Sequence, residues 1–367
     1  MCAATVQSIF SSLRLYKKID PSKLNRKQRH VLADICSCRT KERGFHLDRC
    51  ENCGDEILHY NSCQNPCCPK CQAVAKEIWS MKQEFYTLNI PYFHVVFTLP
   101  SELNQLALVD PVLIYNLLFE CAAESLKTLA ADPKYLGASI GFTAVLHTWG
   151  SNLSLHPHLH CVVSGGGTDK NGKWKSSKKK FFIPVRVLSS LFKGKYLSKL
   201  KKRFDRLKLE DPDSFQIILD QCYGKDWIVY TKKPMTNPSA VIKYLSRYTH
   251  RIAISNGRII SHENGSVTFS YKDYKDHCRV KQMTLSEEEF FRRYMLHVPP
   301  HRFMRIRHYG FLGNRNKDDR IRILRNLTNT PDPGIFKPDM RRILFRVLKK
   351  DVTTCPICGC LRHPLLE

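Results

Sequence analysis

The sequence Leu153-Ser-Leu-His-Pro-His-Leu-His-Cys-Val-Val163 combines three histidines with an alternating apolar pattern. This alternation is typical of a β-strand with one buried face, and the glycines Gly165-Gly-Gly167 that follow predict a turn. Residues two apart on a strand point to the same face. His158 and His160 can therefore offer two imidazoles to one divalent cation, while Leu159 packs into the core behind them.

A cation at this position needs at least one further protein ligand, and two histidines are candidates. His147 lies on a strand predicted over residues 141–149, and it would sit beside the pair if the two strands form an antiparallel hairpin. His156 faces the same side as His160, but about 13 Å separates their Cα atoms along a regular strand. We therefore prefer His147, with His156 as an alternative ligand or a supporting group. Open positions on a hard cation such as Mg²⁺ or Mn²⁺ could polarise a phosphoryl oxygen.

A pair of tyrosines, Tyr244 and Tyr248, lies on a helix that the sequence predicts over residues 238–248. Residues four apart share one face of a helix, about 6 Å apart along its axis. Tyrosines at this spacing are usually packing residues. Two adjacent phenols could also attack a phosphodiester in turn, each holding the strand as a phosphotyrosine. The basic residues that would bind the phosphate are Lys243, Arg247, His250 and Arg251.

The charge of the chain indicates a polyanionic partner. Lys and Arg number 59 against 33 Asp and Glu, which gives a net charge of +26. In nucleic-acid-binding proteins such an excess neutralises phosphates. Without a polyanionic partner, repulsion among the positive charges would oppose a compact state. No stretch approaches the roughly 20 apolar residues of a membrane span, and the N-terminus lacks the charged region of a signal peptide. We therefore expect a cytoplasmic, DNA-associated protein with no membrane role.

Sixteen cysteines in such a protein favour metal sites over disulfides. Two Cys-x2-Cys pairs have the spacing of a four-thiolate zinc ribbon: Cys50/Cys53 and Cys68/Cys71. A segment this polar would not fold without metal, so we expect a structural Zn²⁺ on these four residues. The residues that could hold a second ion are Cys38, His46, Cys63 and Cys67. In the tail, Cys355-x2-Cys358-x-Cys360 and His363 could form a further knuckle.

These features predict an order of regions along the chain. They are a helical lead (1–35), a zinc-binding DNA-recognition module (36–80), a nuclease domain (90–280) with a basic insertion near 165–225, a basic, mostly helical C-terminal region (281–350) and a cysteine-containing tail (351–367). Within the nuclease domain we expect a strand over residues 91–99, one helix from Ser101 to about Ala131, and a hairpin around Glu263-Asn264-Gly265.

His158-Leu-His160 together with Tyr244-Leu-Ser-Arg-Tyr248 resembles the two-tyrosine branch of the HUH single-strand endonucleases, and more closely the transposases of the insertion sequence 91 family. The resemblance extends over roughly residues 20 to 330. Further matching stretches are Phe93-His-Val-Val-Phe-Thr-Leu-Pro100, Leu146-His-Thr-Trp149, Arg305-Ile-Arg-His-Tyr-Gly-Phe-Leu312, Cys38-Arg-Thr40 and the cysteine stretch from Asn61 to Gln72. One departure is Cys67, where the family pattern has a histidine.

The resemblance implies an α+β fold, in which a ferredoxin-like or RNA-recognition-like palm carries the histidines on a central strand of an antiparallel sheet. Tyr244 and Tyr248 would be nucleophiles on a facing helix, and His158 and His160 metal ligands. The implied function is nicking and rejoining of single-stranded DNA at element ends, through a 5′-phosphotyrosine, in rolling-circle DNA transposition. No Gly-x4-Gly-Lys-Ser/Thr loop is present, so a host helicase or replication machinery would be the partner.

Two other functions remain open from the sequence. A plasmid replication initiator or a relaxase-type nickase would use the same nuclease core, although such proteins generally carry a helicase or primase domain. A non-catalytic, zinc-dependent DNA-binding regulator would explain the charge and the cysteines. It would leave the histidine strand and the paired tyrosines without a role.

Overall fold

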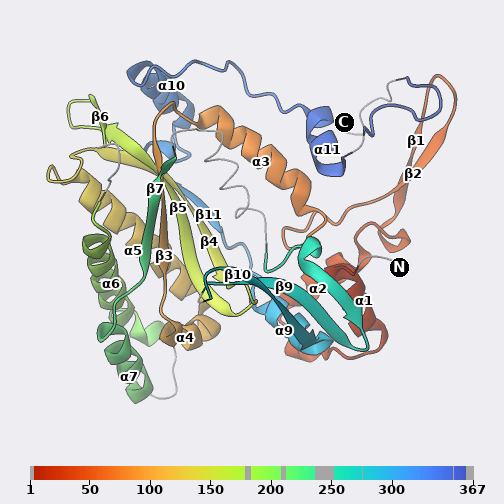
Figure 1. The fold of residues 1–367 in the computed structure, drawn as a ribbon, viewed down its shortest axis with the longest axis horizontal. Coiled ribbons are helices and arrows are strands. Elements are labelled where there is room, and N and C mark those ends of the chain that lie inside the picture. Colours follow the sequence, from red (N-terminus) through yellow and green to blue (C-terminus); the bar gives the residue numbers. More distant parts are fainter. Residues whose placement is uncertain are drawn as a thin grey trace.

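The computed structural model describes residues 4–177, 183–207, 212–235, 252–274, 276–349 and 351–360. Its largest element is a six-stranded antiparallel sheet in the order β11-β4-β5-β3-β7, with β6 paired to the end of β5 (Figure 1). The strands are β3 (Tyr92–Thr98), β4 (Ser139–Trp149), β5 (Leu155–Thr168), β6 (Trp174–Ser176), β7 (Val229–Met235) and β11 (Ile306–Tyr309). The histidine segment is therefore part of β5, in the middle of the sheet.

Side-chain alternation gives the sheet two different faces. Leu146 on β4 and Leu159 on β5 point into a large apolar core, which is covered by helices (Figure 1). These helices are α4 (Asn104–Val109), α5 (Pro111–Ala131), α6 (Val185–Lys201) and α7 (Pro212–Tyr223). On the opposite face, α3 (Gln72–Tyr86) and α10 (Lys317–Leu327) cover one end of the sheet around Val145 and Val162. The histidines occupy the other end of that face.

A second apolar core is formed by the N-terminal helices together with segments that lie between β7 and β11 in the sequence. Helices α1 (Val6–Leu15), α2 (Arg26–Ser37) and α9 (Glu287–Leu296) pack with a three-stranded antiparallel sheet of β8 (Ile259–Glu263), β9 (Ser266–Asp273) and β10 (Arg279–Ser286). Phe10, Phe269 and Phe290 are fully buried in this core. The hairpin of β1 (Phe45–Arg49) and β2 (Glu56–Tyr60) projects from it, and α11 (Met340–Leu348) packs against α3.

The predicted mixture of helices and antiparallel sheet is confirmed, but the predicted turn at the glycines is wrong. Strand β5 continues through Gly165 to Gly167 and ends at Thr168. A Cβ atom at Gly167 would lie 2.1 Å from the carbonyl oxygen of Ser139 on β4. The glycines therefore allow a close approach of neighbouring backbone within the sheet.

The single helix predicted from Ser101 to Ala131 is also wrong. A short 3-10 helix (Ser101–Leu103) and α4 come first, and α5 begins separately at Pro111. The side chain of Asp110 caps α5 by accepting a hydrogen bond from Leu113 N–H at 2.9 Å. Proline cannot continue the preceding helix, because it has no N–H to donate, but it is well suited to the first turn of a new one.

The hairpin predicted around residues 263–265 is present. Asn264 and Gly265 both adopt left-handed backbone conformations, with φ of 49° and 71°, between β8 and β9. The strands β10 and β11 were not predicted, and β11 forms within the region expected to be mostly helical. The helix predicted over residues 238–248 lies outside the described residues. No helix in the described part of the chain is long and apolar enough to cross a membrane.

Candidate functional site

His147, His158 and His160 converge on the open face of the central sheet. Their ligand nitrogens all lie within 4.8 Å of one another. His147 on β4 pairs directly with His158 on β5, and the Nε2 atoms of His158 and His160 are 3.1 Å apart. Two ligands at right angles on an ion about 2.1 Å away would be separated by about 3 Å. The donor set therefore fits a single divalent cation.

Hydrogen bonds orient two of these imidazoles. The Nδ1–H group of His158 donates to the carbonyl oxygen of His156 at 2.7 Å, which leaves Nε2 as its lone-pair nitrogen. Nδ1 of His160 lies 2.9 Å from Nε2 of His94 on β3, and the two rings are stacked. A hydrogen bond to the second nitrogen commonly fixes the orientation of a metal-binding histidine. His94 was not predicted as a site residue. The signal that could have revealed it is its place on β3, where it shares a face with Val96, the residue that pairs with His160.

Burial keeps the imidazoles neutral. It lowers the pKa of His158 and of His94 to about 4, and lowers the pKa of His160 well below its ordinary value. His160 and His147 are 8% and 4% exposed, whereas His158 is half-buried. Neutral imidazole is the form that binds metal. His158 and His160 are therefore in the ligating state at neutral pH.

The structure brings only some of the predicted residues to this site. His147 lies with the pair, whereas the ring of His156 is exposed, with its centre 5.1 Å from that of His158, and its nitrogens are not part of the group. The predicted nucleophiles and phosphate-binding residues lie outside the described residues. They are Tyr244, Tyr248, Lys243, Arg247, His250 and Arg251.

The thiol groups of Cys38, Cys63, Cys68 and Cys71 form a compact cluster, with all Sγ atoms within 4.8 Å of one another. Sγ of Cys71 lies 3.5 Å from Sγ of Cys38 and from Sγ of Cys63. Four thiolates about 2.3 Å from a zinc ion are about 3.8 Å apart. The cluster therefore has the dimensions of a structural zinc site.

The predicted ribbon pairing differs from this arrangement. Cys50 and Cys53 lie between β1 and β2, at the far end of the hairpin, and so are carried away from Cys68 and Cys71. Their thiols instead group with Cys355 and Cys358 of the C-terminal segment. Spacing along the chain indicates which cysteines form a knuckle. It does not indicate which two knuckles share an ion.

His46 and Cys67, predicted as ligands of a second ion, have other contacts. The Nδ1–H group of His46 donates to Oδ1 of Asn61 at 3.0 Å, and its ring stacks on His59. Cys67 is buried, which raises its thiol pKa to about 11, and its carbonyl oxygen accepts a hydrogen bond from the hydroxyl of Tyr294 at 2.6 Å. The departure from the family pattern at Cys67 therefore leaves the four-thiol cluster complete.

Two cavities with basic and aromatic side chains in their lining share His301, and neither is lined by His147, His158 or His160. One is a cavity of about 490 Å³ whose lining includes Arg26, Lys27 and Trp149. A second cavity, of about 760 Å³, is lined in part by Trp79, Arg302, Phe303 and Arg307, and His301 contributes to both. Trp149 also stacks on His147, with ring centres 4.3 Å apart. Cations interleaved with aromatic rings are suited to single-stranded nucleic acid.

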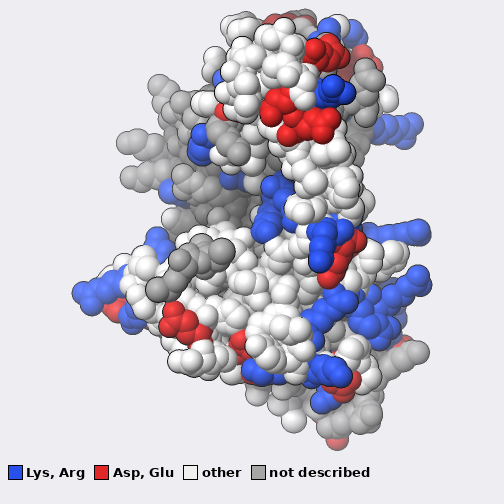
Figure 2. Space-filling view, turned by 90° about the vertical axis from the view of Figure 1, so that its right-hand side faces the viewer, with Lys and Arg blue, Asp and Glu red and all other residues white. Residues whose placement is uncertain are grey.

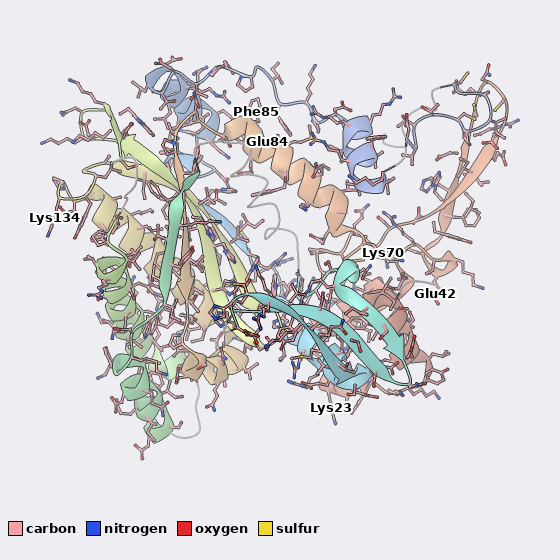
Figure 3. The ribbon with its side chains drawn as sticks, in the orientation of Figure 1. Lys23, Glu42, Lys70, Glu84, Phe85 and Lys134 are labelled. Atoms are coloured by element: carbon pink, nitrogen blue, oxygen red, sulfur yellow. The ribbon has the colours of Figure 1, made fainter. Side chains whose placement is uncertain are left out.

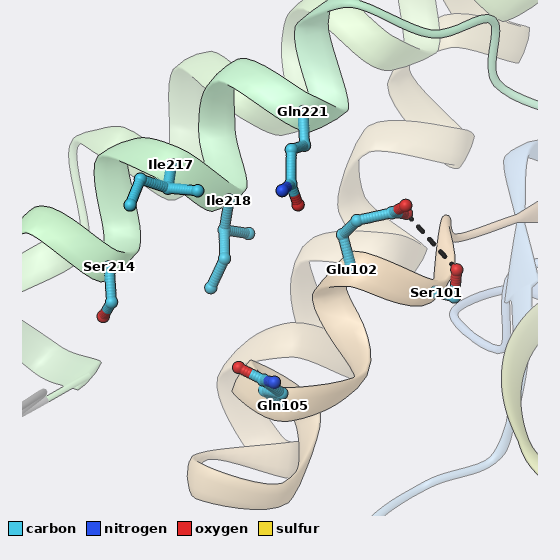
Figure 4. Close-up of a pocket in the computed structure, with 7 residues that line it drawn as sticks. All are labelled: Ser101, Glu102, Gln105, Ser214, Ile217, Ile218 and Gln221. Atoms are coloured by element: carbon cyan, nitrogen blue, oxygen red, sulfur yellow. Dashed lines mark hydrogen bonds between the residues drawn. The ribbon is translucent and has the colours of Figure 1, made fainter.

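Charge is unevenly distributed over the described surface. On the face seen in Figure 2, most of the visible Lys and Arg side chains lie in the middle and at the lower right, with several Asp and Glu among them, and a cluster of Asp and Glu lies near the top beside further Lys and Arg. Another cavity, of about 420 Å³, lies between α4 and α7 on the helical side of the sheet (Figure 4). Among the described residues that line it, Glu102 is the one with an ionisable side chain, and its carboxylate forms an ion pair with Lys225. These lining residues include no set of metal-binding side chains.

Comparisons with known proteins agree with these features. A family described as "Putative transposase" matches residues 141–320, and one described as "Transposase zinc-binding domain" matches residues 9–99, which include the buried four-thiol cluster. The match to the zinc-binding family and the four-thiol cluster therefore both support a structural Zn²⁺ in the N-terminal module. No solved structure gives a significant match.

Two relatives match along most of their length. A protein named "Putative transposase y4qJ" from Sinorhizobium fredii is 43% identical over 353 residues, which cover 91% of this chain and 88% of that protein. The "Transposase for insertion sequence element IS801" from Pseudomonas savastanoi pv. phaseolicola is 29% identical over 340 residues, 90% of this chain and 81% of that protein. The chain therefore belongs to the insertion sequence 91 family of transposases, which act on DNA.

Proposed function

We propose that this transposase cleaves and rejoins single-stranded DNA with Tyr244 and Tyr248 as nucleophiles and a divalent cation on His147, His158 and His160. The observation that carries the proposal is the 3.1 Å separation of the Nε2 atoms of His158 and His160. Both atoms are oriented by hydrogen bonds at the opposite nitrogen of their rings. A bound Mg²⁺ or Mn²⁺ would polarise the scissile phosphate.

In the reaction, a tyrosine hydroxyl attacks phosphorus, and the bond from phosphorus to the 3′ oxygen breaks. The phenol loses its proton, the departing 3′ oxygen gains one, and the 5′ phosphate remains linked to tyrosine. Attack of a 3′-hydroxyl on this phosphotyrosine reverses the step and joins strands. Since no phosphate bond energy is lost, one protein can both cut and rejoin.

The position of Met235 supports this assignment of the tyrosines. Met235 at the end of β7 pairs with Tyr92 at the start of β3, whereas His160 pairs with Val96. Four residues of strand separate Tyr92 from Val96, or about 13 Å. Met235, the last described residue before the tyrosines, therefore lies at the end of the sheet that is distant from the histidines.

Ile252, the first described residue after the tyrosines, supports the same assignment of the nucleophiles. Ile252 belongs to the same apolar cluster as Leu153, which precedes the histidine strand β5 by two residues. The described chain therefore stops at Met235, at the distant end of the sheet, and resumes at Ile252, near the histidine end. Tyr244 and Tyr248 lie in the interval between these two residues.

The architecture also supports an HUH palm. His158 and His160 lie on the middle strand of an antiparallel sheet and His147 on its neighbour, with helices packed on the opposite face, as in a ferredoxin-like or RNA-recognition-like domain. The cavity beside Trp149 would hold part of the single strand close to His147. The zinc-binding module would recognise element ends, and rolling-circle transposition would rely on a host helicase or replication machinery to supply single strands.

A cleavage assay tests this function. Purified protein is incubated with a single-stranded oligonucleotide that carries an element end, with Mg²⁺ or Mn²⁺ and without either. We expect a 5′ fragment with a free 3′-hydroxyl and a 3′ fragment that is linked to the protein through its 5′ phosphate and migrates with it on a denaturing gel, only when metal is present. DNA binding without cleavage under all conditions would instead indicate a zinc-dependent regulator.

A further inference from the structure

Two knuckles at opposite ends of the chain have the same local structure. Cys50-x2-Cys53-Gly54 follows β1, and Cys355-x2-Cys358-Gly359 lies in the C-terminal segment. The N–H group of Gly54 donates to the carbonyl of Cys50 at 2.8 Å, and that of Gly359 to the carbonyl of Cys355 at 3.0 Å. Both glycines adopt left-handed conformations, with φ of 74° and 72°. Such turns present two thiols on one side.

The backbone closes each knuckle in the same way. Cys50 N–H donates to the carbonyl oxygen of Asp55 at 2.8 Å, and Cys355 N–H donates to that of Cys360 at 2.8 Å. In both cases the bond joins the first cysteine to the residue five positions later. Each half is therefore a formed zinc knuckle that offers two ligands and needs a second half.

The four thiols meet with the dimensions of one metal site. Sγ of Cys50 lies 3.6 Å from Sγ of Cys358, and Sγ of Cys53 lies 3.6 Å from Sγ of Cys355. A disulfide needs about 2.05 Å between sulfurs, whereas four thiolates around zinc are about 3.8 Å apart. All four Sγ atoms fall within 4.8 Å of one another. Figure 3 shows sulfur atoms where the hairpin meets the C-terminal segment.

We propose that Cys50, Cys53, Cys355 and Cys358 bind a second structural Zn²⁺ that clasps the C-terminal segment to the β1–β2 hairpin. The ligands from the two ends are more than 300 residues apart in sequence. Four thiolates fill a tetrahedral site and leave no open position, so the ion has a structural task. This inference does not depend on the nuclease mechanism.

The surroundings explain why a metal is needed there. The hairpin has little core of its own, since Phe45 and Leu47 on β1 are each 55% exposed. The C-terminal segment is otherwise held by the packing of α11 on α3, with an ion pair of 3.1 Å between Arg346 and Glu77. An exposed ion pair contributes little stability. Metal binding would therefore supply most of the free energy that orders both parts.

The two thiolate sites differ in accessibility. In the second cluster Cys53 is exposed, Cys358 is half-buried and the other two cysteines are buried, whereas the first cluster has no exposed cysteine: Cys71 is half-buried and the other three are buried. A chelator or an oxidant reaches exposed thiolates first. The clasp ion should therefore leave before the buried one, with loss of the docked C-terminal segment while the N-terminal module stays folded.

Zinc stoichiometry in the full-length protein tests the clasp. A thiol-directed mercurial releases thiolate-bound zinc, which a zinc-binding dye then measures. The wild type should release two equivalents, and C355S/C358S, C50S/C53S and the quadruple variant should each release one. If substitutions at either end of the chain remove one and the same zinc ion, the four cysteines share one site and do not form two separate sites. C278S, which changes an exposed cysteine outside both clusters, and C360S should still release two.

Limited proteolysis provides a measurement that does not rely on counting ions. In C355S/C358S, cleavage between residues 328 and 360 should accelerate at least tenfold, while circular dichroism of the rest is unchanged. In the wild type, chelator titration followed by native mass spectrometry should show loss of one ion before the other, with tail cleavage following the first loss. One zinc in the wild type, or two in the quadruple variant, would overturn the proposal. DNA cleavage is not part of either readout, so failure here is separate from failure of the nuclease mechanism.

Discussion

The histidine site and the two cysteine clusters hold their donor atoms in opposite ways. The imidazoles of His147, His158 and His160 stand on strands whose other face is anchored by a large apolar core. The cysteines lie in turns and short segments: those of the first cluster border the second apolar core, whereas those of the second cluster have little apolar support. The first arrangement can form before an ion binds, whereas the second depends on the ion for its structure. Incomplete coordination on a rigid sheet suits chemistry, and complete coordination of flexible loops suits folding.

The largest effect should follow disruption of the buried thiolate cluster. Cys68→Ser removes one of its four ligands, and structural zinc contributes roughly 10–16 kcal/mol to folding in small zinc modules. We expect residues 36–71 to unfold, as measured by zinc content and hydrogen exchange, with Cys278→Ser as the matched control. EDTA at concentrations that stop DNA cleavage should leave this module folded. If Cys68→Ser kept its zinc and its exchange protection, the assignment of this cluster would be incorrect.

The next effect concerns the histidines. His158→Ala and His160→Ala should each slow cleavage at least about 1,000-fold, or about 4 kcal/mol of barrier, because the cation acts on the scissile phosphate. Binding to single-stranded DNA should persist, since Lys and Arg provide most of the affinity. Cleavage kinetics and gel-shift affinity measure the two separately, with the exposed His277 changed to alanine as control. Normal cleavage rates in either variant would remove the basis for a catalytic cation.

A smaller effect is expected at His94, which positions His160 through a hydrogen bond of 2.9 Å. Loss of such a supporting group typically weakens metal affinity by about 10- to 100-fold. His94→Ala should therefore need more Mn²⁺ for half-maximal cleavage, with a nearly normal rate at saturation, and His94→Gln should recover part of the loss. A rate defect that saturating metal does not repair would show that His94 has a different role.

The sequence predicted the histidine site more successfully than the cysteine sites. Strand alternation relates neighbouring residues, so it placed His158 and His160 on one face and allowed His147 beside them, as the structure has them. A zinc site can join distant segments, and no local pattern indicated that Cys50 would meet Cys358. Neither did any pattern separate the two clusters.

Long-range contacts also explain the other differences. Strand β11 forms because Ile306 to Tyr309 pair with β4 at the edge of the sheet. Local propensity does not reveal such a partner. The role of His94 depends on β3 lying next to β5. Similarly, the glycines of β5 were interpreted as a turn, because the close backbone approach that requires them comes from β4 and from Pro91.

The measurement that tests the central claim most directly is the mapping of the protein–DNA adduct. After cleavage of an element-end oligonucleotide with Mn²⁺, mass spectrometry of proteolytic fragments identifies the residue that carries the 5′ phosphate. We expect Tyr244 or Tyr248 in the wild type, residual single-round adduct in each single Tyr→Phe variant, and none in the double variant, with Tyr274→Phe unchanged as the control. An adduct that persists in the double variant and maps to another residue would contradict the proposed mechanism.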